Sequence, residues 1–350
     1  MFEKPLDFLA IGDITTDAFI RLKEAHVNCR IDNTACELCL KFADKVPFES
    51  VTVVKAVGNS PNAAVAAARL GLNSGLITDI GSDQNGTDCL ANLKKEGVAT
   101  NFVARHEGIE TNYHYVLWYG AERTILVNHK EFPYLLPRIS IAPKWIYLSS
   151  IGGGGQSEKY HEEIAAYLLA HPQIKLAFQP GTFQMKLGTD KLATIYKRTE
   201  VFICNVEEAE RITGLSAGSD RKDIKKLFAA IHALGPKIVH ITDGPKGAYC
   251  SDRTSGKALA TSNGNGHVWF MPIYPDPKPP LERTGCGDAY ASTFVSALIL
   301  GKSVEEALIW APINPMWVVQ FVGAQEGLLT RAGLESWLSH APLDYKPVKL

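Results

Sequence analysis

Short runs of apolar residues recur along the chain, and most are followed by a segment whose apolar positions have helical spacing. The runs lie at residues 8–11, 75–80, 145–148, 175–178, 201–204 and 238–242. Continuous apolar runs of this length are typical of strands that are buried on both faces. Strands that alternate with helices predict an α/β fold, a three-layer sandwich whose mostly parallel central sheet is covered by helices on both sides.

Two segments, residues 18–56 and 101–128, interrupt this alternation. Within the second, residues 112–120 and 123–127 are rich in aromatic and β-branched residues and flank a turn at Gly120, Ala121 and Glu122, which predicts a hairpin. We expect the two segments to pair as a small β lid on a single α/β domain that spans residues 1–350.

Helical spacing dominates the C-terminal third of the chain. It predicts helices at about residues 288–300, 303–310, 316–322 and 331–339. Pro312 and Pro315 stand between the second and the third of these, and a proline inside a helix removes a backbone hydrogen bond. The two segments are therefore expected to be separate helices.

Charge and hydropathy favour a small molecule as the binding partner. The chain contains 36 Lys+Arg and 37 Asp+Glu, for a net charge of −1, so attraction to nucleic acid or to an anionic membrane is not expected. No uncharged apolar stretch approaches the ~18 residues of a membrane span. Asp7 and Asp13 interrupt the opening apolar segment, where a signal peptide has an apolar core. We therefore expect a cytoplasmic protein.

Seven cysteines, an odd number in a long chain, argue against a secreted disulfide framework and favour free thiols or a local metal site. Four potential zinc ligands lie in the predicted lid: His26, Cys29, Cys36 and Cys39. Tetrahedral zinc accepts three thiolates and one imidazole, but the spacer between Cys29 and Cys36 is short for a zinc module. A structural zinc site and buried or free lid cysteines remain as alternatives, and the short spacer favours the second.

A serine hydrolase is one alternative chemistry. Residues 214–218 place Ser216 in the G-x-S-x-G pattern of a nucleophile elbow. That elbow requires a strand before the serine, whereas this segment follows a helical pattern. A helix end followed by a loop is therefore the better interpretation.

The segment from Thr284 to Asp288 leads through small residues directly into an apolar helix. The first N–H groups of a helix have no backbone acceptor, and together with the helix dipole they form a site for an anion such as a phosphoryl group. A carboxylate there is suited to take a proton from an attacking hydroxyl. Alternatively, Asp288 is only the N-terminal cap of the helix, a position that favours aspartate.

The same segment resembles the C-terminal signature T-G-A-G-D of the PfkB/ribokinase-like carbohydrate kinases, with Cys286 in place of alanine. Further segments resemble motifs of that family and occur in its order. They are G-N-S-P-N and A-R-L-G within residues 58–71, N-x-x-E at 205–208, T-x-G-x-x-G at 242–247 and a closing G-A-Q-E-G-L at 323–328. The resemblance covers nearly the whole chain and implies a ribokinase-like fold.

The resemblance also implies roles for the residues that match the C-terminal signature. Asp288 would be the general base, and the N–H groups of Gly285, Cys286 and Gly287 would form the anion hole that stabilises the transferring phosphoryl group. A thiol at a helix N-terminus can be reactive, which would make Cys286 sensitive to oxidation. The simpler interpretation is a small residue that supplies its backbone N–H.

For the nucleotide, the resemblance implies ATP with Mg²⁺ and, as a further cofactor, a monovalent cation. Asn205 and Glu208 would hold Mg²⁺ largely through water; without the family context they would be a helix cap and a solvated helix acid. Lys246 would contact phosphate, or only solvent. The ATP-binding residues implied in this way are Asn205, Thr242, Gly244, Lys246 and Gly247.

The acceptor would be bound by Asp17, Gly58 and Asn62, which match positions that contact sugar hydroxyls in the family. A carboxylate and a carboxamide both accept hydrogen bonds from hydroxyl groups, which selects a polyhydroxylated substrate. Asp13 matches no motif and is interpreted as a turn residue. Val57 replaces the first glycine of the family's Gly-Gly pair, so the identity of the acceptor stays open.

The sequence therefore predicts an ATP-dependent kinase that phosphorylates a hydroxyl of a sugar or a related polyol. A nucleoside kinase of the same family and a non-catalytic ligand-binding member are the alternatives, although Asp288, Asn205 and Glu208 argue against the second. Three apolar lid residues, Phe42, Val46 and Phe48, leave two alternatives: a homodimer through the lid, or packing of these residues on their own domain.

Overall fold

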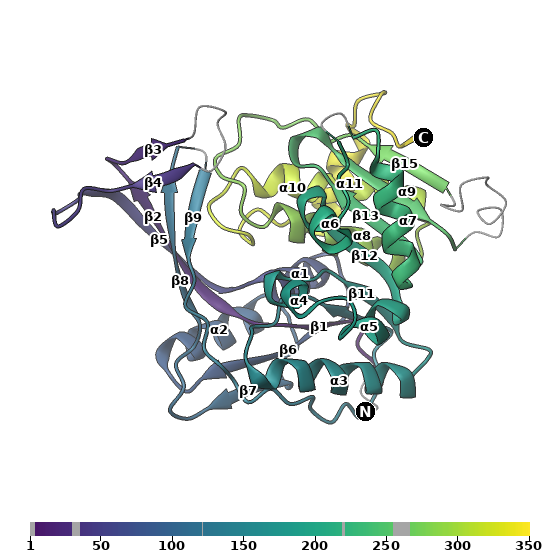
Figure 1. The fold of residues 1–350 in the computed structure, drawn as a ribbon, viewed down its shortest axis with the longest axis horizontal. Helices are drawn as coiled ribbons and strands as arrows, with labels where there is room; N and C mark the ends of the chain where they lie inside the picture. Colours follow the sequence, from purple (N-terminus) through teal and green to yellow (C-terminus); the bar gives the residue numbers. More distant parts are fainter. Residues whose placement is uncertain (1–3, 30–35, 121, 219–220, 255–266) are drawn as a thin grey trace.

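A ten-stranded sheet forms the centre of the computed structural model, which describes residues 4–29, 36–120, 122–218, 221–254 and 267–350 (Figure 1). Its strands lie in the order β16 (Val348–Lys349), β15 (His267–Met271), β14 (Ala248–Asp252), β13 (Ile238–Thr242), β12 (Thr199–Asn205), β11 (Lys175–Phe178), β10 (Trp145–Leu148), β1 (Phe8–Ile11), β6 (Ser74–Gly81) and β7 (Val103–His106). Neighbouring strands from β7 to β13 are parallel, and the pairs from β13 to β16 are antiparallel.

Every apolar run identified in the sequence is a strand of this sheet, which confirms the predicted α/β fold. Consecutive residues of one strand belong to different cores. Phe8 and Ala10 pack into the apolar core on one face, and Leu9 and Ile11 pack into the core on the other. Because both faces are buried, the strand is apolar at every position rather than at alternate ones.

Helices cover both faces of the sheet. On the face that buries Phe8 lie α1 (Asn59–Arg69), α2 (Gln84–Lys95), α8 (Cys286–Ile299), α9 (Val304–Trp310), α10 (Ile313–Val318) and α11 (Arg331–Ser339). On the other face lie α3 (Gly155–Ala170), α5 (Ala193–Arg198), α6 (Val206–Thr213) and α7 (Ile224–Leu234). Two short elements, α4 (Thr182–Leu187) and the 3-10 helix η1 (Gly244–Lys246), follow β11 and β13. Within the described ranges, no helix combines the length and the apolar character that a membrane span requires.

The third of the predicted C-terminal helices is shifted in the structure. It was expected at residues 316–322, whereas α10 covers Ile313–Val318. Pro312 is the N-cap residue of α10, and Pro315 lies in its first turn. A proline is tolerated there because the first N–H groups of a helix have no intrahelical acceptor. Both prolines therefore belong to the start of α10, whereas the expected helix began after them.

A second, four-stranded sheet projects from one side of the central sheet and is called the lid here (Figure 1). Its strands lie in the order β5 (Phe48–Val57), β2 (Thr15–Leu22), β8 (Tyr113–Tyr119) and β9 (Glu122–Leu126), and β8 and β9 form the predicted hairpin. The expected lid segment 101–128 is divided, because β7 pairs in parallel with β6 in the central sheet. The second lid segment therefore begins at β8, after the crossover from β6 through α2 to β7.

Two of the three lid cysteines differ from both expectations, and Cys39 is a free thiol as the second alternative expected. Cys29 and Cys36 form a disulfide in the structure, which removes two thiolates from the proposed zinc site at His26, Cys29, Cys36 and Cys39. The described residues contain no group of three or more histidine, cysteine or acidic side chains arranged for a metal ion. His26 and Cys39 instead lie opposite each other in the small hairpin of β3 (His26–Asn28) and β4 (Glu37–Cys39). The zinc prediction is therefore wrong.

Candidate active site

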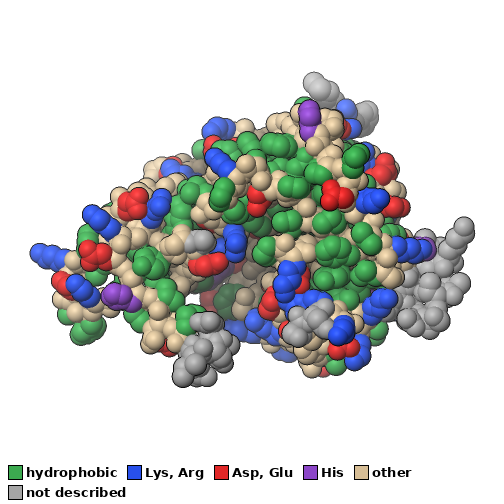
Figure 2. Space-filling model, turned by 90° about the horizontal axis from the view of Figure 1, so that it is seen from above, with side chains coloured by type: hydrophobic (Ala, Val, Ile, Leu, Met, Phe, Trp, Pro, Cys, Tyr) green, Lys and Arg blue, Asp and Glu red, His purple; other side chains and the backbone are tan. Residues whose placement is uncertain are grey.

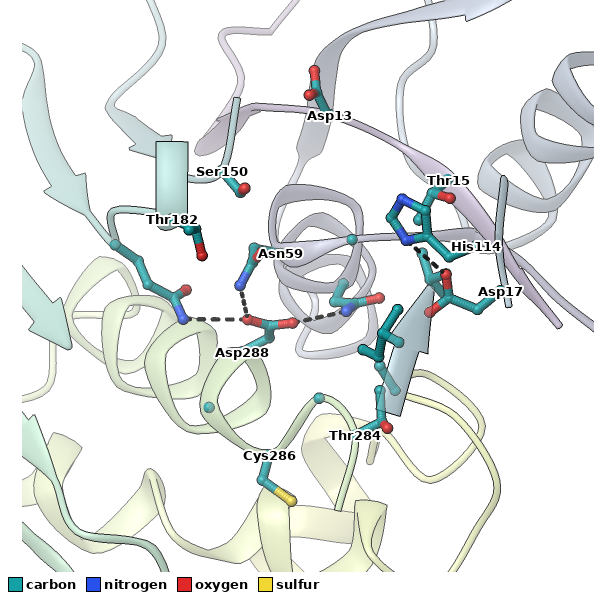
Figure 3. Close-up of a pocket in the computed structure, with 18 of the residues that line it drawn as sticks. Asp13, Thr15, Asp17, Asn59, His114, Ser150, Thr182, Thr284, Cys286 and Asp288 are labelled. Carbon is teal, nitrogen blue, oxygen red and sulfur yellow. Dashed lines mark hydrogen bonds and ion pairs between the residues drawn. The ribbon is translucent and has the colours of Figure 1, made fainter. Parts of the chain in front are cut away.

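A cavity of about 480 Å³ lies between the lid and the carboxyl ends of the parallel strands. Figure 2 shows it as a hollow in the surface, and Figure 3 shows its walls. Its volume is in the range of small-molecule sites. Most of the site residues predicted from the sequence line it: Asp17, Gly58, Asn62, Asn205, Glu208, Thr242, Gly285, Cys286, Gly287 and Asp288.

Asp288 lies at the centre of these walls, and three side-chain amides hold its carboxylate (Figure 3). Asn59 Nδ2 donates to Asp288 Oδ1 over 2.7 Å, and Asn62 Nδ2 donates to Oδ2 over 2.8 Å. Gln179 Nε2 donates to Oδ1 over 3.2 Å. The N-cap residue of α8 is Gly285, and Asp288 makes no capping bond. The alternative interpretation of Asp288 as a helix cap is therefore wrong.

The environment of Asp288 shifts its acidity in two opposing directions. Burial raises the pKa of the carboxyl group above its usual range, and the three amide donors and the Arg123 charge partly oppose that increase. A carboxylate with a raised pKa is a stronger base than an exposed one, yet the amide donors keep it available in the ionised form. This combination suits proton abstraction from a hydroxyl.

The N-terminus of α8 brings backbone N–H groups to the same cavity. Gly285 has a φ of 80°, and a Cβ there would lie 2.3 Å from Ala324 Cβ, so this turn requires glycine. Beyond it, the first N–H groups of α8 have no intrahelical acceptor. Burial raises the pKa of the Cys286 thiol to about 12, so the thiol stays protonated and the reactive-cysteine interpretation is not supported. The residues of this turn line the cavity, so N–H groups without an intrahelical acceptor lie at its wall.

Asn205 and Glu208 cap α6 and also line the cavity. Asn205 Oδ1 accepts from the Glu208 N–H over 2.8 Å, and Glu208 Oε2 accepts from the Asn205 N–H over 2.9 Å. The cap alternative is thus correct for the local structure, but Glu208 is not a solvated acid. Burial raises the pKa of its carboxyl group, which is the environment that a bound cation would offset. One carboxylate and one carboxamide fit Mg²⁺ held mainly through water and phosphate oxygens.

Among the predicted nucleotide residues at 242–247, only Thr242, the last residue of β13, lines the cavity. Gly247 has a φ of 112°, and a Cβ there would lie 2.5 Å from the Met271 carbonyl oxygen, so packing alone explains this glycine. Lys246 is exposed, with Nζ 4.0 Å from Asp243 Oδ2. The predicted residues Gly244, Lys246 and Gly247 therefore do not line the cavity.

Asp17 and Asn62 stand on the lid side of Asp288. Asp17 is a buried residue of β2, and His114 Nδ1 of β8 lies 3.4 Å from its Oδ1 (Figure 3). Asn62 bridges two parts of the site, because its Oδ1 accepts from Gln325 Nε2 over 3.0 Å while its Nδ2 binds Asp288. Gly58, with a φ of 124°, allows α1 to approach the backbone of Asp13.

Asp13 is a wall residue of the cavity rather than a simple turn residue. Its carboxylate accepts from Tyr134 Oη over 3.0 Å and from the Gly152 N–H over 2.6 Å. His129 Nδ1 lies 3.3 Å from Asp13 Oδ2. The sequence interpretation of Asp13 was wrong because these partners come from distant segments.

Several further wall residues were missed from the sequence: Asn59, His114, Arg123, His129 and Gln179. Asn59 stands three residues before Asn62 on α1, so helical spacing alone was a signal for it. Arg123 comes from β9, and its buried Nε has no hydrogen-bond acceptor among the described residues. Beside it, Arg283 Nη1 of the body lies 3.3 Å from Glu122 Oε1 of the lid, an ion pair that joins the two across the cavity mouth.

The amino-acid sequence is similar to those of known kinases. A sequence model described as pfkB family carbohydrate kinase matches residues 28–331. The 5-dehydro-2-deoxygluconokinase of Bacillus subtilis is 25% identical over 314 residues, which cover 82% of this chain and 88% of that protein. The ribokinase of Haemophilus influenzae is 25% identical over 291 residues, which cover 81% of this chain and 87% of that protein.

Structure comparison gives the same fold. The structure of Arabidopsis thaliana ribokinase complexed with ribose and ATP superimposes with a TM-score of 0.75. It is 18% identical in sequence, and the match covers 96% of this chain and 99% of that chain. The predicted ribokinase-like fold is therefore confirmed.

Proposed function

This chain belongs to the pfkB family of carbohydrate kinases, ATP-dependent phosphotransferases with an alcohol group as acceptor, and we propose that Asp288 is the general base of the reaction. The observation that carries the proposal is the buried Asp288 carboxylate, held by three amides beside the first turn of α8. In this position the base and the anion site face the same cavity, as in-line transfer of a phosphoryl group requires.

We propose the following roles for these residues in the transfer of the phosphoryl group. Asp288 accepts the proton of the acceptor hydroxyl, whose oxygen bonds to the γ-phosphorus while the bond from phosphorus to the ADP oxygen breaks. The N–H groups of Gly285, Cys286 and Gly287 stabilise the charge on the phosphoryl oxygens. Arg123 of the lid adds a positive charge over the same place, since it acts electrostatically on both Asp288 and Cys286.

Asn205 and Glu208 are the proposed Mg²⁺ residues, and Asn205 is also the proposed contact to ATP. When bound, Mg²⁺ neutralises charge on the phosphate oxygens. Thr242, Gly244, Lys246 and Gly247 are proposed to bind the nucleotide where it leaves the cavity. The family resemblance further implies a monovalent cation, and a titration with KCl at constant ionic strength tests for activation.

Two acceptors follow from the names of relatives: 5-dehydro-2-deoxygluconate and ribose. Asp17, Gly58 and Asn62 are proposed to bind the acceptor. A nucleoside remains as a second candidate class. The non-catalytic alternative is disfavoured because Asp288 and the first residues of α8 line the same cavity.

The test is the release of ADP from MgATP by the purified protein with D-ribose, 5-dehydro-2-deoxygluconate, other hexoses and nucleosides as separate acceptors. Asp288→Asn is the matched variant, because it keeps the shape of the side chain. Loss of a general base lowers kcat by ~10²- to 10⁴-fold. Acceptor-dependent ADP release that persists at the original rate in Asp288→Asn would show that another group is the base.

We also propose a homodimer through the outer face of the lid. In the register of the lid sheet, Val53, Tyr115 and Leu126 form one row with Ala18, and the first three are exposed. Of the residues expected to contribute, Phe42 and Phe48 are exposed and Val46 is partly buried. Light scattering of the wild type and of Tyr115→Lys tests the proposal, since a charge on this face is expected to give a monomer.

A cytoplasmic location is a proposal as well. Five of the seven cysteines are free thiols, which suits a reducing compartment, whereas the Cys29–Cys36 disulfide does not. Fractionation of cells that express the full chain tests the location.

A further inference from the structure

Two aspartate–histidine pairs stand side by side in the part of the cavity next to the lid. His129 Nδ1 lies 3.3 Å from Asp13 Oδ2, and His114 Nδ1 lies 3.4 Å from Asp17 Oδ1. The centroids of the two imidazole rings are 5.1 Å apart. All four side chains line the cavity, and no motif in the sequence assigned a role to either histidine.

These side chains carry buried polar atoms that lack partners. Within the described part of the chain, Asp17 Oδ1, His114 Nε2 and His129 Nδ1 make no hydrogen bond. Asp17 Oδ1 and His129 Nδ1 each have only the ion-pair contact given above, whereas His114 Nε2 has neither a hydrogen bond nor an ion pair among the described residues. A buried polar group without a hydrogen bond costs about 1–3 kcal/mol. His114 Nε2 in particular indicates that a polar ligand completes the hydrogen bonding of this wall.

The pairs are held in place by the fold. Asp17 and His114 occupy directly neighbouring positions of the parallel strands β2 and β8. Asp13 is fixed by hydrogen bonds from Tyr134 Oη and the Gly152 N–H. The two histidines are thus presented at a preformed wall, as a specific binding site requires.

We infer that His114 and His129 determine acceptor specificity by binding neighbouring hydroxyl groups on the part of the acceptor that is not phosphorylated. The inference rests on the proposed kinase function. Figure 3 shows Asp13 and His114 above Asp288 and Cys286 below it, where the phosphoryl group is expected.

The chemistry of the pairs selects the class of ligand. A hydroxyl group donates one hydrogen bond and accepts others, which matches a carboxylate oxygen beside an imidazole nitrogen. The carboxylates of Asp13 and Asp17 repel a negatively charged group of the acceptor that comes close to them. The end of the acceptor that faces the lid is therefore a neutral polyol, and any carboxylate or phosphate of the acceptor lies elsewhere in the cavity.

The test compares His114→Gln and His129→Gln with His106→Gln. His106 is a matched control, because it forms a similar pair with Asp79, at 2.7 Å, but does not line the cavity. The acceptor is D-ribose or 5-dehydro-2-deoxygluconate, whichever the wild type phosphorylates faster. Each lost hydrogen bond to the acceptor is expected to raise its KM about 10-fold, with kcat and the KM for ATP nearly unchanged. His106→Gln is expected to behave as the wild type.

The possible failures can be told apart. If the wild type phosphorylates neither sugar nor any other compound of the panel, the proposed function fails first. If the wild type is active and the acceptor KM is unchanged in both cavity variants, only the inference about the histidines is wrong. An equal rise of the acceptor KM in His106→Gln would also overturn it, because it would indicate a structural effect. The alanine variants at the three positions are measured as well, because a glutamine amide can still bond to a hydroxyl group, and they replace any glutamine variant that does not fold.

Discussion

Asn59 offers a direct test of the role of Asp288, because it donates the shortest of the three hydrogen bonds to that carboxylate, from Nδ2 to Oδ1 over 2.7 Å. The perturbation is Asn59→Ala. Burial already raises the pKa of Asp288, and each amide donor lowers it by stabilising the ionised form. Removing one donor therefore raises the pKa further, and the base is protonated over a wider range of acidic pH.

The size of the effect follows from the kind of bond. A hydrogen bond to a charged group contributes ~1.5–3 kcal/mol, and each 1.36 kcal/mol is a factor of ten in an equilibrium or a rate. At a pH where the wild-type base is mostly protonated, kcat/KM is therefore expected to fall ~10- to 100-fold in Asn59→Ala. At alkaline pH both proteins carry an ionised Asp288, so the rates are expected to converge.

The assay is ADP release measured across the pH range in quenched samples, which avoids coupling enzymes with their own pH dependence. Asn73→Ala is the matched control, because Asn73 is exposed, donates to the Pro5 carbonyl oxygen, and lies outside the cavity. A loss of activity in Asn59→Ala that is equal at every pH would refute the reasoning, since it would place Asn59 on the substrate and not on the base.

Three further results are expected. Arg123→Met should lower kcat by ~10- to 100-fold, as measured by single-turnover kinetics, because the proposed bond from the guanidinium to a phosphoryl oxygen is charge-assisted. The melting temperature should change little, because Arg123 Nε has no hydrogen-bond partner among the described residues. Gly285→Ala should lower the free energy of unfolding by ~1–3 kcal/mol in a urea titration, because the new Cβ would meet Ala324 Cβ at 2.3 Å and φ is 80°. Thiol titration of the unfolded chain should count five reactive groups without reductant and seven after reduction, the two additional groups being Cys29 and Cys36. Elemental analysis should detect no zinc. Seven reactive groups without reductant would refute the disulfide.

Predictions that depended on local pattern agree with the structure. The apolar runs are strands of the central sheet, and the hairpin of β8 and β9 lies where its aromatic and β-branched residues placed it. Local pattern also explains the errors. Pro312 and Pro315 were interpreted as a break between two helices, although a proline is equally suited to the start of a helix. The segment of β7 was assigned to the lid, because a short, mostly polar strand at a sheet edge carries no apolar run.

Part of the site could also be predicted from the sequence, where a motif is contiguous. Residues 284–288 form one continuous turn into α8, and Asn205 and Glu208 share one capping box, so their chemistry is local. The residues that were missed make their contacts at long range. Asn59 and Gln179 are separated from Asp288 by 229 and 109 positions, and neither belongs to a motif that names its partner.

The order of motifs and the apolar runs were thus sufficient, by themselves, to determine the fold, the family and the position of Asp288 at the start of α8. Only the tertiary structure decided which amides hold Asp288, that Asp13 faces the cavity, and that Cys29 pairs with Cys36. The physical reason is that periodicity reports whether a position is buried, which is a local property. Strand register and crossover connections decide which distant side chains lie beside a buried residue. The register of β2 against β8, for example, places His114 beside Asp17.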